Sequence, residues 1–176
     1  MITKAFVTGG AGFIGSNLVD ELISNNIEVI VLDDLSTGKK KNINSKAKFI
    51  KNSINLMSLD DLTSELNGVD VVFHFAALAR VQPSIESPIS YNDVNATGTL
   101  KVLFASHQAK VKRVIYSSSS SVYGDTNIFP TPETAKLEPL SPYGLQKLIG
   151  EQYCTLFSKI YNLDTVSLRY FNVYGE

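Results

Sequence analysis

The sequence contains one cysteine, no tryptophan and no excess of either charge. Since the lone Cys154 cannot form a disulfide within the chain, we expect a reducing compartment, the cytoplasm. The 16 lysine and arginine residues nearly balance the 17 aspartate and glutamate residues, so the charge gives no electrostatic basis for binding nucleic acid. No apolar run approaches the ~20 residues of a membrane helix, so we expect no membrane partner. One cysteine and two widely separated histidines also make no metal site.

The 176 residues suffice for one domain with its own hydrophobic core, and we expect residues 1–176 to form that domain. Apolar runs rich in β-branched residues alternate with segments of helical periodicity. Strands are expected at 4–8, 27–32, 49–50, 69–75, 113–116 and 165–170, and helices at 13–24, 56–66, about 88–109 and from 141 onward, with Ser58 and Ser141 as N-caps of the second and last helix. Continuous apolar strands separated by helices indicate parallel βαβ units, and the handedness of their crossovers predicts the α/β class with a doubly wound parallel sheet.

A glycine-rich turn, Thr8 to Gly15, joins the first predicted strand to the first predicted helix. Gly9, Gly12 and Gly15 let the backbone turn tightly and approach a pyrophosphate, which N–H groups at the start of the helix would bind. Asp33, at the end of the second strand, is placed to accept hydrogen bonds from an adenosine ribose 2′-hydroxyl. The combination predicts a dinucleotide site in a Rossmann fold; the alternative is a plain tight turn with a surface aspartate.

The same aspartate bears on which dinucleotide binds. A carboxylate beside the ribose would repel a 2′-phosphate, for which an NADP site usually supplies an arginine. Lys39, Lys40 and Lys41 could pair with that phosphate, although a solvated loop is the simpler explanation of the run. The sequence therefore favours NAD as the cofactor.

Tyr143 and Lys147 stand four residues apart at the start of the last predicted helix. At this spacing both side chains lie on one helix face, and a lysine ammonium near a phenol lowers its pKa from about 10 toward that of a general base. Ser119 follows the fifth predicted strand, where doubly wound sheets gather ligands. A Tyr-x-x-x-Lys pair alone is more often ordinary helix surface, but together with the glycine turn and the serine it predicts a catalytic site.

Several blocks spread over nearly the whole chain carry a resemblance to a known family, and they are 8–15, 32–38, 74–77, 94–99, 116–124, 141–143 and 168–175. In these blocks the sequence resembles the NAD-dependent nucleotide-sugar epimerase/dehydratase family, within the extended short-chain dehydrogenases/reductases. The resemblance is closest to the members that are 4-epimerases of UDP-hexoses and UDP-N-acetylhexosamines. Such proteins are considerably longer and have a second lobe that clamps the nucleotide sugar. We therefore expect this chain to be the N-terminal part, with the sugar-nucleotide lobe missing after Asn172.

The resemblance implies a role for each matching position. Tyr143 would be the catalytic base, Lys147 would hold the nicotinamide ribose and tune the tyrosine, and Ser119 would hold the sugar oxygen. The other implied cofactor contacts are Gly9, Gly12, Phe13, Ile14 and Gly15 at the pyrophosphate, Asp33 and Asp34 at the adenosine ribose, Ser53 and Ile54 at the adenine, Phe75, Ala76, Ala77 and Ala79 along the central stretch, Asn95 on the nicotinamide side, and Tyr170 and Phe171 near the nicotinamide. The implied substrate contacts are Ser84, Ser119, Ser120, Ser121, Tyr143 and Asn172.

One position departs from the family pattern. Relatives usually carry an aspartate followed by an aliphatic residue after the third strand, where the pair contacts adenine. This chain has Ser53-Ile54 there, so the adenine contact is either weaker or made by the serine hydroxyl.

The residues after Ser119 discriminate among the reactions of the family. The 4,6-dehydratases carry acidic residues just before the Val-Tyr-Gly block, which move the protons at C5 and C6 of the sugar. This chain has Ser120 and Ser121 there, and hydroxyls of ordinary pKa do not easily do that work. The resemblance therefore implies epimerisation at C4 through a 4-keto intermediate, of UDP-glucose and UDP-galactose or their N-acetylated forms. The open alternatives are an NAD-binding fragment without turnover, and a related dehydratase, reductase or decarboxylase.

Some residues are expected to serve the structure rather than the chemistry. His74 is predicted to be an interior histidine, His107 to lie on a solvated helix face, and Cys154 to take part in packing. In relatives the two long helices pair across a dimer, so a homodimer is expected here. Its interface would include Leu100, Leu103, Phe104, Leu148 and Phe157, unless these side chains belong to the core of the chain itself.

Overall fold

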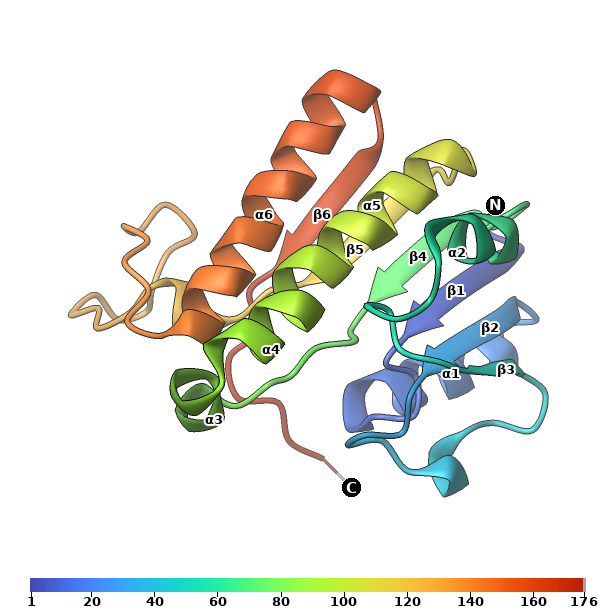
Figure 1. Ribbon diagram of the computed structural model, residues 1–176, viewed down its shortest axis with the longest axis horizontal. Helices are drawn as coiled ribbons and strands as arrows, with labels where there is room; N and C mark the ends of the chain where they lie inside the picture. Colours follow the sequence, from blue (N-terminus) through green and yellow to red (C-terminus); the bar gives the residue numbers. More distant parts are fainter. Residues whose placement is uncertain (176) are drawn as a thin grey trace.

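The computed structural model describes residues 1–175, and Glu176, the last residue of the expected domain, lies outside this range. The described residues form one parallel sheet of β1 (Lys4–Thr8), β2 (Glu28–Asp33), β3 (Lys48–Lys51), β4 (Val71–His74), β5 (Arg113–Ser117) and β6 (Asp164–Leu168). Their order is β3-β2-β1-β4-β5-β6, so the winding reverses between β1 and β4 (Figure 1). This order confirms the doubly wound sheet, and it places the switch point where such folds bind ligands.

Helices pack on both faces of the sheet. They are α1 (Phe13–Ser24), α2 (Leu59–Glu65), α3 (Val81–Glu86), α4 (Pro88–Asn92), α5 (Gly98–Gln108) and α6 (Pro142–Tyr161), with short helical turns at η1 (Lys40–Asn42), η2 (Asp93–Thr97) and η3 (Ser120–Val122). Figure 1 shows α5 and α6 side by side, along β5 and β6. The described residues therefore repeat the strand, helix, strand alternation that the apolar pattern predicts.

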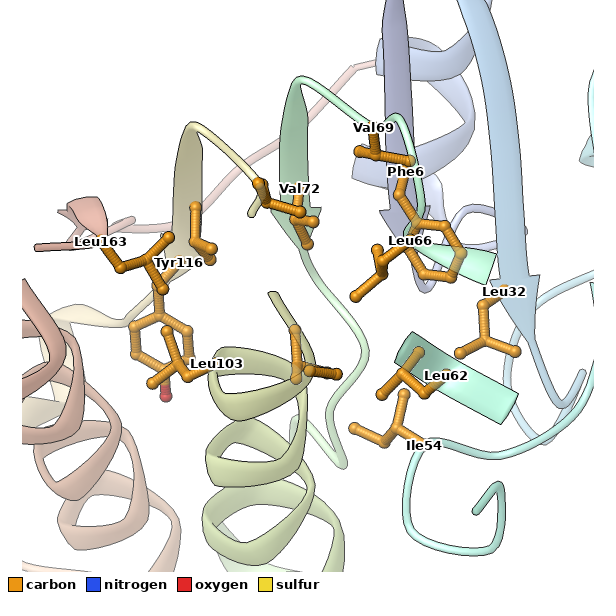
Figure 2. Close-up of a cluster of buried hydrophobic side chains, with 14 of the residues drawn as sticks. Phe6, Leu32, Ile54, Leu62, Leu66, Val69, Val72, Leu103, Tyr116 and Leu163 are labelled. Carbon is orange, nitrogen blue, oxygen red and sulfur yellow. The ribbon is translucent and has the colours of Figure 1, made fainter. Parts of the chain in front are cut away.

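The two faces of the sheet carry separate hydrophobic cores, because alternate residues of a strand point to opposite faces. Val7 of β1 packs with Val19 of α1 in one core. Phe6 of the same strand belongs to the other core, which α2, α5 and α6 cover. Figure 2 shows this larger core, where Tyr116 of β5 lies beside Leu103 of α5. Both cores lie under the strand ends that carry the predicted site and hold those ends in fixed positions.

The N-terminal ends of α2 and α6 have the predicted caps. The Ser58 hydroxyl accepts a hydrogen bond from the N–H of Asp61 at 3.1 Å, and the Ser141 hydroxyl accepts one from the N–H of Gly144 at 3.0 Å. The predicted start of the second helix at residue 56 is wrong, because the N–H groups of 56 and 57 both bond to the carbonyl of Ser53 in a turn. The first helical residue is the one after the cap.

The single helix predicted over 88–109 is divided into α4, the π-helical turn η2 and α5. In the turn, Asn95 is 1% exposed, and its backbone carbonyl accepts a hydrogen bond from the Thr99 hydroxyl at 2.6 Å. Single π turns occur mostly at functional sites, and side-chain bonds to helix carbonyls compete with the regular helical pattern. The preceding helix α3 is only 6 residues long and was not predicted.

The side chains proposed for a dimer interface lie partly inside the chain's own core. Leu103 and Phe157 are 0% and 4% exposed, and Leu100 and Phe104 pack against the same core. For Leu103 and Phe157 the interface prediction is therefore wrong, because α5 and α6 turn these side chains toward the sheet. The exposed large apolar side chains on α4 and α6 are instead Ile89, Leu145, Leu156, Ile160 and Tyr161.

The two edges of the sheet differ in chemistry. The edge strand β3 begins with Lys48 and ends with Lys51. The opposite edge strand β6 exposes Val166 and Leu168, two apolar side chains on one face.

Candidate active site

A cleft of about 810 Å³ follows the carboxyl ends of the strands. It extends from the glycine turn after β1 past the ends of β2 and β3 on one side, and to β5 and the first turns of α6 on the other. Every residue predicted for the cofactor or the substrate lines this cleft except Ser84 and Asn95. The structure thus brings together residues that lie more than a hundred positions apart in the sequence.

The glycine turn leaves room that no other residue type would leave. Gly9 has φ +71, and a Cβ atom there would lie 2.7 Å from the backbone nitrogen of Ala76. A Cβ atom on Gly15 would lie 2.3 Å from the carbonyl oxygen of Gly9. The N–H of Gly12 closes the turn by donating to that same oxygen at 3.1 Å. The start of α1 therefore faces the cleft as bare backbone, which fits the pyrophosphate of a dinucleotide.

Two aspartates follow at the end of β2. The carboxylate of Asp33, 8% exposed, accepts hydrogen bonds from the N–H of Ala11 at 3.0 Å and of Leu35 at 2.8 Å. It thus ties the glycine turn to the loop after β2 while lining the cleft. Burial acts to raise the pKa of Asp34, but hydrogen bonds from Ser36 and Ser53 outweigh it and hold that pKa below its ordinary value. Both groups are acceptors, which fits the hydroxyls of a ribose and disfavours a 2′-phosphate.

Asn95 does not reach the cleft, and its predicted contact on the nicotinamide side is wrong for this structure. Its side-chain oxygen accepts the N–H of Leu78 at 2.9 Å, and its side-chain nitrogen donates to the carbonyl of Leu78 at 3.0 Å and to Gln146 at 3.1 Å. The amide is thereby used by the chain itself. Asn95 instead positions the segment after β4, whose residues Ala76 to Ala79 line the cleft.

His74, at the end of β4, is the interior histidine that the sequence predicts. It is 1% exposed, with Nδ1 2.7 Å from the Thr8 hydroxyl and Nε2 2.9 Å from the Thr99 hydroxyl. The single proton of Thr99 goes to the carbonyl of Asn95, so Nε2 must carry the histidine proton and Nδ1 must accept from Thr8. Burial, with a contribution from the charge of Lys147, lowers the pKa of His74 to about 3. The ring is therefore a neutral link between the glycine turn and the π turn.

The predicted catalytic residues meet at the other end of the cleft. Lys147 is 3% exposed, and its ammonium donates to the carbonyl of Ser117 at 2.7 Å and lies 5.9 Å from the ring centre of Tyr143. Burial lowers the pKa of Lys147 to about 8. Ser119 lies in the loop after β5 and hydrogen-bonds to Tyr143. The helical spacing thus places Tyr143 and Lys147 on one face of α6, as predicted.

The expected lowering of the Tyr143 pKa by Lys147 is wrong for this structure. Burial raises the pKa of Tyr143, the hydrogen bond with Ser119 lowers it in part, and the neighbouring Tyr91 raises it further. The reason is geometric, since the ammonium bonds to the backbone of Ser117 rather than to the phenol oxygen. In this state the tyrosine is protonated.

Ser84, predicted to contact the substrate, is 0% exposed and lies outside the cleft. Its hydroxyl donates to the carbonyl of Val81 at 2.5 Å and accepts the N–H of Tyr143 at 3.1 Å. The substrate contact is therefore wrong, because both bonding directions are used within the chain. Ser84 instead satisfies one of the free N–H groups at the start of α6, and so fixes the backbone that carries the tyrosine.

Sequence reasoning missed a polar cluster behind the catalytic residues. Glu151 accepts hydrogen bonds from the Ser118 hydroxyl at 2.5 Å and from Arg169 at 2.8 Å and 2.9 Å. These side chains join α6 to the loop after β5 and to the end of β6. Glu151 stands four residues after Lys147, on the same helix face, and this spacing was the signal available in the sequence. Hydrogen bonds to Glu151, opposed in part by burial, raise the pKa of Arg169 above its ordinary value.

The segment after β6 closes the cleft on the substrate side. Tyr170 and Phe75 stack with ring centres 6.5 Å apart, and the carbonyl of Tyr170 accepts the N–H of Ser120 at 2.8 Å. Phe171 and Asn172 line the cleft beside them. The predicted residues on both sides of the nicotinamide position thus face a common space.

Residues 1–175 contain no group of three histidine, cysteine, aspartate or glutamate side chains arranged to hold a metal ion. Within the same range, none of the helices is both long and apolar enough to cross a membrane. The site therefore has to be interpreted from its hydroxyl, ammonium and backbone groups.

Comparison with known proteins agrees with this geometry. The model of the NAD dependent epimerase/dehydratase family matches residues 5–176. The chain belongs to this family. Its members depend on NAD, and the glycine turn and Asp33 described above are the groups of this chain that fit that cofactor.

Individual relatives share the fold over the whole chain. UDP-glucose 4-epimerase of Lactobacillus helveticus is 39% identical over 172 residues, which are 98% of this chain and 52% of the relative. The structure of UDP-N-acetylglucosamine 4-epimerase from Methanobrevibacter ruminantium, in complex with UDP-N-acetylmuramic acid, matches with TM-score 0.94 and 42% identity, over 99% of this chain and 56% of that one. UDP-glucose 4-epimerase of Thermus thermophilus, in complex with NAD, matches with TM-score 0.92 and 36% identity, over 98% and 56% of the two chains. The chain spans about half the length of the curated relatives it matches.

Proposed function

We propose that this chain forms the NAD-binding domain, residues 1–176, of an enzyme that epimerises a UDP-sugar at C4 through a 4-keto intermediate. The observation that carries the proposal is the meeting of Ser119, Tyr143 and Lys147 at one end of a cleft whose other end is the glycine turn. The named activities of the relatives support the same reaction.

Each residue at the catalytic end has a defined task in this proposal. NAD, when bound, supplies the acceptor and then the donor of the hydride at C4. The Tyr143 oxygen takes the proton of the 4-hydroxyl and returns it when the sugar is reduced again. The Ser119 hydroxyl holds the same sugar oxygen. Lys147 is charged below its pKa of about 8, and its positive charge opposes the effect of burial, which raises the pKa of Tyr143.

The residues beside Ser119 support epimerisation over dehydration. Ser120 and Ser121 line the cleft where a 4,6-dehydratase requires acids for the protons at C5 and C6. For the substrate we propose UDP-hexoses, including N-acetylated ones, with Asn172 and the serine block as contacts. The solved relative that carries UDP-N-acetylmuramic acid supports an acetamido group among the substrates.

The test is to incubate the protein with NAD and UDP-glucose, UDP-galactose or their N-acetylated forms, and to separate the epimers. Tyr143→Phe is expected to abolish interconversion and leave the NAD content unchanged, since the ring keeps its packing and loses only the oxygen that moves the proton. Tyr161→Phe, on the exposed end of the same helix, is the matched control and is expected to keep full activity. An active Tyr143→Phe variant, or release of a 4-keto-6-deoxy sugar, would contradict the proposal.

A second function is NAD binding without turnover, which the coverage of about half of each relative favours. Absorbance near 340 nm separates the two possibilities. Bound NAD that neither becomes reduced nor supports epimerisation with any UDP-sugar would favour the binding function. Net consumption of reduced cofactor, or release of CO₂, would instead indicate a reductase or a decarboxylase.

We further propose a homodimer that pairs the exposed apolar faces of α4 and α6. The side chains that would be covered are Ile89, Leu145, Leu156 and Ile160. Light scattering after gel filtration is expected to give twice the chain mass, and Leu145→Lys is expected to reduce it to a monomer. Ile128→Lys, at an exposed site away from these helices, is expected to leave the dimer intact. A monomeric wild-type protein would contradict the proposed pairing.

The proposed location is the cytoplasm. Cys154 is free and 1% exposed, and burial raises its pKa to about 12, so the side chain is a protonated thiol. Free thiols without disulfides suit a reducing compartment. Fractionation of cells that produce the protein is expected to recover it with the cytoplasmic enzymes, and recovery from the culture medium would contradict this location.

A further inference from the structure

The segment after β3 forms the far end of the cleft, beyond the two aspartates of β2. Ser53 and Ile54 line the cleft there, and Ile54 is also part of the larger hydrophobic core. Under the proposed function, this end receives the adenine ring, with the apolar side chain against the ring face. The polar edge of the ring then lies toward the serine hydroxyl.

The hydroxyl of Ser53 has a fixed direction. It donates to the side-chain oxygen of Asn55 at 2.6 Å. A serine hydroxyl has one proton and two lone pairs, so once the proton is used the group can only accept. The Asp34 carboxylate is a second acceptor beside it, and under the proposed function that carboxylate accepts from the ribose hydroxyls. Asn55 is then the partner that decides where the Ser53 proton points.

The backbone of this segment is held from α5. The Lys101 ammonium donates to the carbonyl of Asn55 at 2.9 Å and to the carbonyl of Met57 at 2.8 Å. The N–H of Met57 in turn donates to the carbonyl of Ser53 at 2.9 Å. A Cβ atom on Gly98 would lie 2.6 Å from Ile54, so helix and segment are in close contact. Asn55 therefore has a fixed backbone from which to orient the serine.

We infer that Asn55 makes the Ser53 hydroxyl a hydrogen-bond acceptor that selects the 6-amino group of adenine. This inference rests on the proposed binding of NAD. An amino group donates, and it matches an acceptor, whereas the 6-carbonyl of hypoxanthine also accepts and faces the lone pairs unpaired. A serine free to rotate would accommodate both rings, because it can donate as well as accept. Asn55 is thus a positioning residue for base specificity.

The experiment compares the affinities of NAD and of nicotinamide hypoxanthine dinucleotide by calorimetric titration. The wild-type protein is expected to bind NAD about tenfold more tightly or better, the ratio to which about 1.4 kcal/mol corresponds. Ser53→Ala is expected to bring the ratio close to one. Asn55→Ala is expected to bring it within about threefold, because the freed hydroxyl can turn and donate to the carbonyl. Asn55→Asp keeps the acceptor oxygen and is expected to keep the wild-type ratio.

Nicotinamide mononucleotide, which lacks the adenosine half, is the control ligand. Its affinity is expected to be the same in all variants, which separates a local effect from misfolding. A wild-type ratio near one, or an unchanged ratio in Asn55→Ala that still binds NAD, would overturn the inference and leave the proposed function standing. A wild-type chain that binds neither dinucleotide would overturn both.

Discussion

Acidification is expected to destabilise this protein well above the pH at which carboxylates titrate, and the cause is His74. The ring is buried and neutral, with both nitrogens committed to hydroxyl groups. Burial lowers its pKa to about 3 in the folded chain, whereas an unfolded chain has a histidine pKa of about 6.5. The folded state therefore binds fewer protons between these values. Its stability is fully present above about pH 6.5 and is lost as the pH falls toward 3.

The size of the effect depends little on how low the folded pKa lies. At about pH 5.5, an unfolded histidine is mostly protonated and the buried one is not, which removes about 1 kcal/mol of folding free energy relative to neutral pH. Any folded-state pKa below about 4.5 gives the same loss. In a domain of this size, about 1 kcal/mol lowers the melting temperature by roughly 2–4 °C. Carboxylates contribute little in this window, because their ordinary pKa values lie near 4.

The assay is urea unfolding, followed by circular dichroism, at about pH 7 and about pH 5.5. His74→Gln is expected to be less stable at both values but to lose most of the difference between them, because glutamine does not titrate. His107→Gln, which removes the other histidine of the sequence, is the matched control and is expected to retain the difference. Equal stability of the wild-type protein at both pH values would refute the assignment of a neutral, buried His74.

Three further substitutions test the supports of the cleft. Glu151→Gln leaves the Arg169 guanidinium partly buried without its carboxylate and is expected to cost about 3 kcal/mol of unfolding free energy, whereas Glu133→Gln, whose backbone carbonyl serves the same arginine, is expected to cost nothing measurable in urea titrations. Gly15→Ala places a Cβ atom 2.3 Å from a carbonyl oxygen of the glycine turn and is expected to weaken NAD binding by more than tenfold in calorimetry. Unchanged affinity would show that the turn relaxes. Ser84→Ala leaves a buried N–H at the start of α6 unpaired and is expected to lower stability by about 1–2 kcal/mol without changing NAD affinity; a selective loss of epimerisation rate at unchanged stability would contradict this structural role.

The sequence predicted the sheet and the cleft because both depend on local patterns. Continuous apolar strands separated by helices specify parallel pairing, and the strand ends then meet at one edge. The glycine turn, Asp33 and the pair Tyr143 and Lys147 each carry a spacing that fixes their place relative to the nearest strand or helix end. These residues line the cleft in the structure.

The predictions failed where a polar side chain is used by a distant part of the same chain. Asn95 and Ser84 were assigned to ligands, yet their partners are the backbone of Leu78 and Tyr143, which only the packing of α3, η2 and α6 brings near. The Tyr143 pKa failed for a similar reason, since helical spacing brings Lys147 close but does not decide which oxygen receives its proton. Burial and hydrogen-bond competition are tertiary quantities and have no signature in spacing.

The two edges of the sheet imply a direction for unwanted assembly. Edge strands present backbone groups that can pair with another chain, and lysines at an edge discourage such pairing. Lys48 and Lys51 supply that protection on β3. The strand β6 shows Val166 and Leu168 instead, so strand addition at high protein concentration is expected to begin there. A lysine at position 166 or 168 is accordingly the change that we expect to improve handling of the purified protein without touching the cleft.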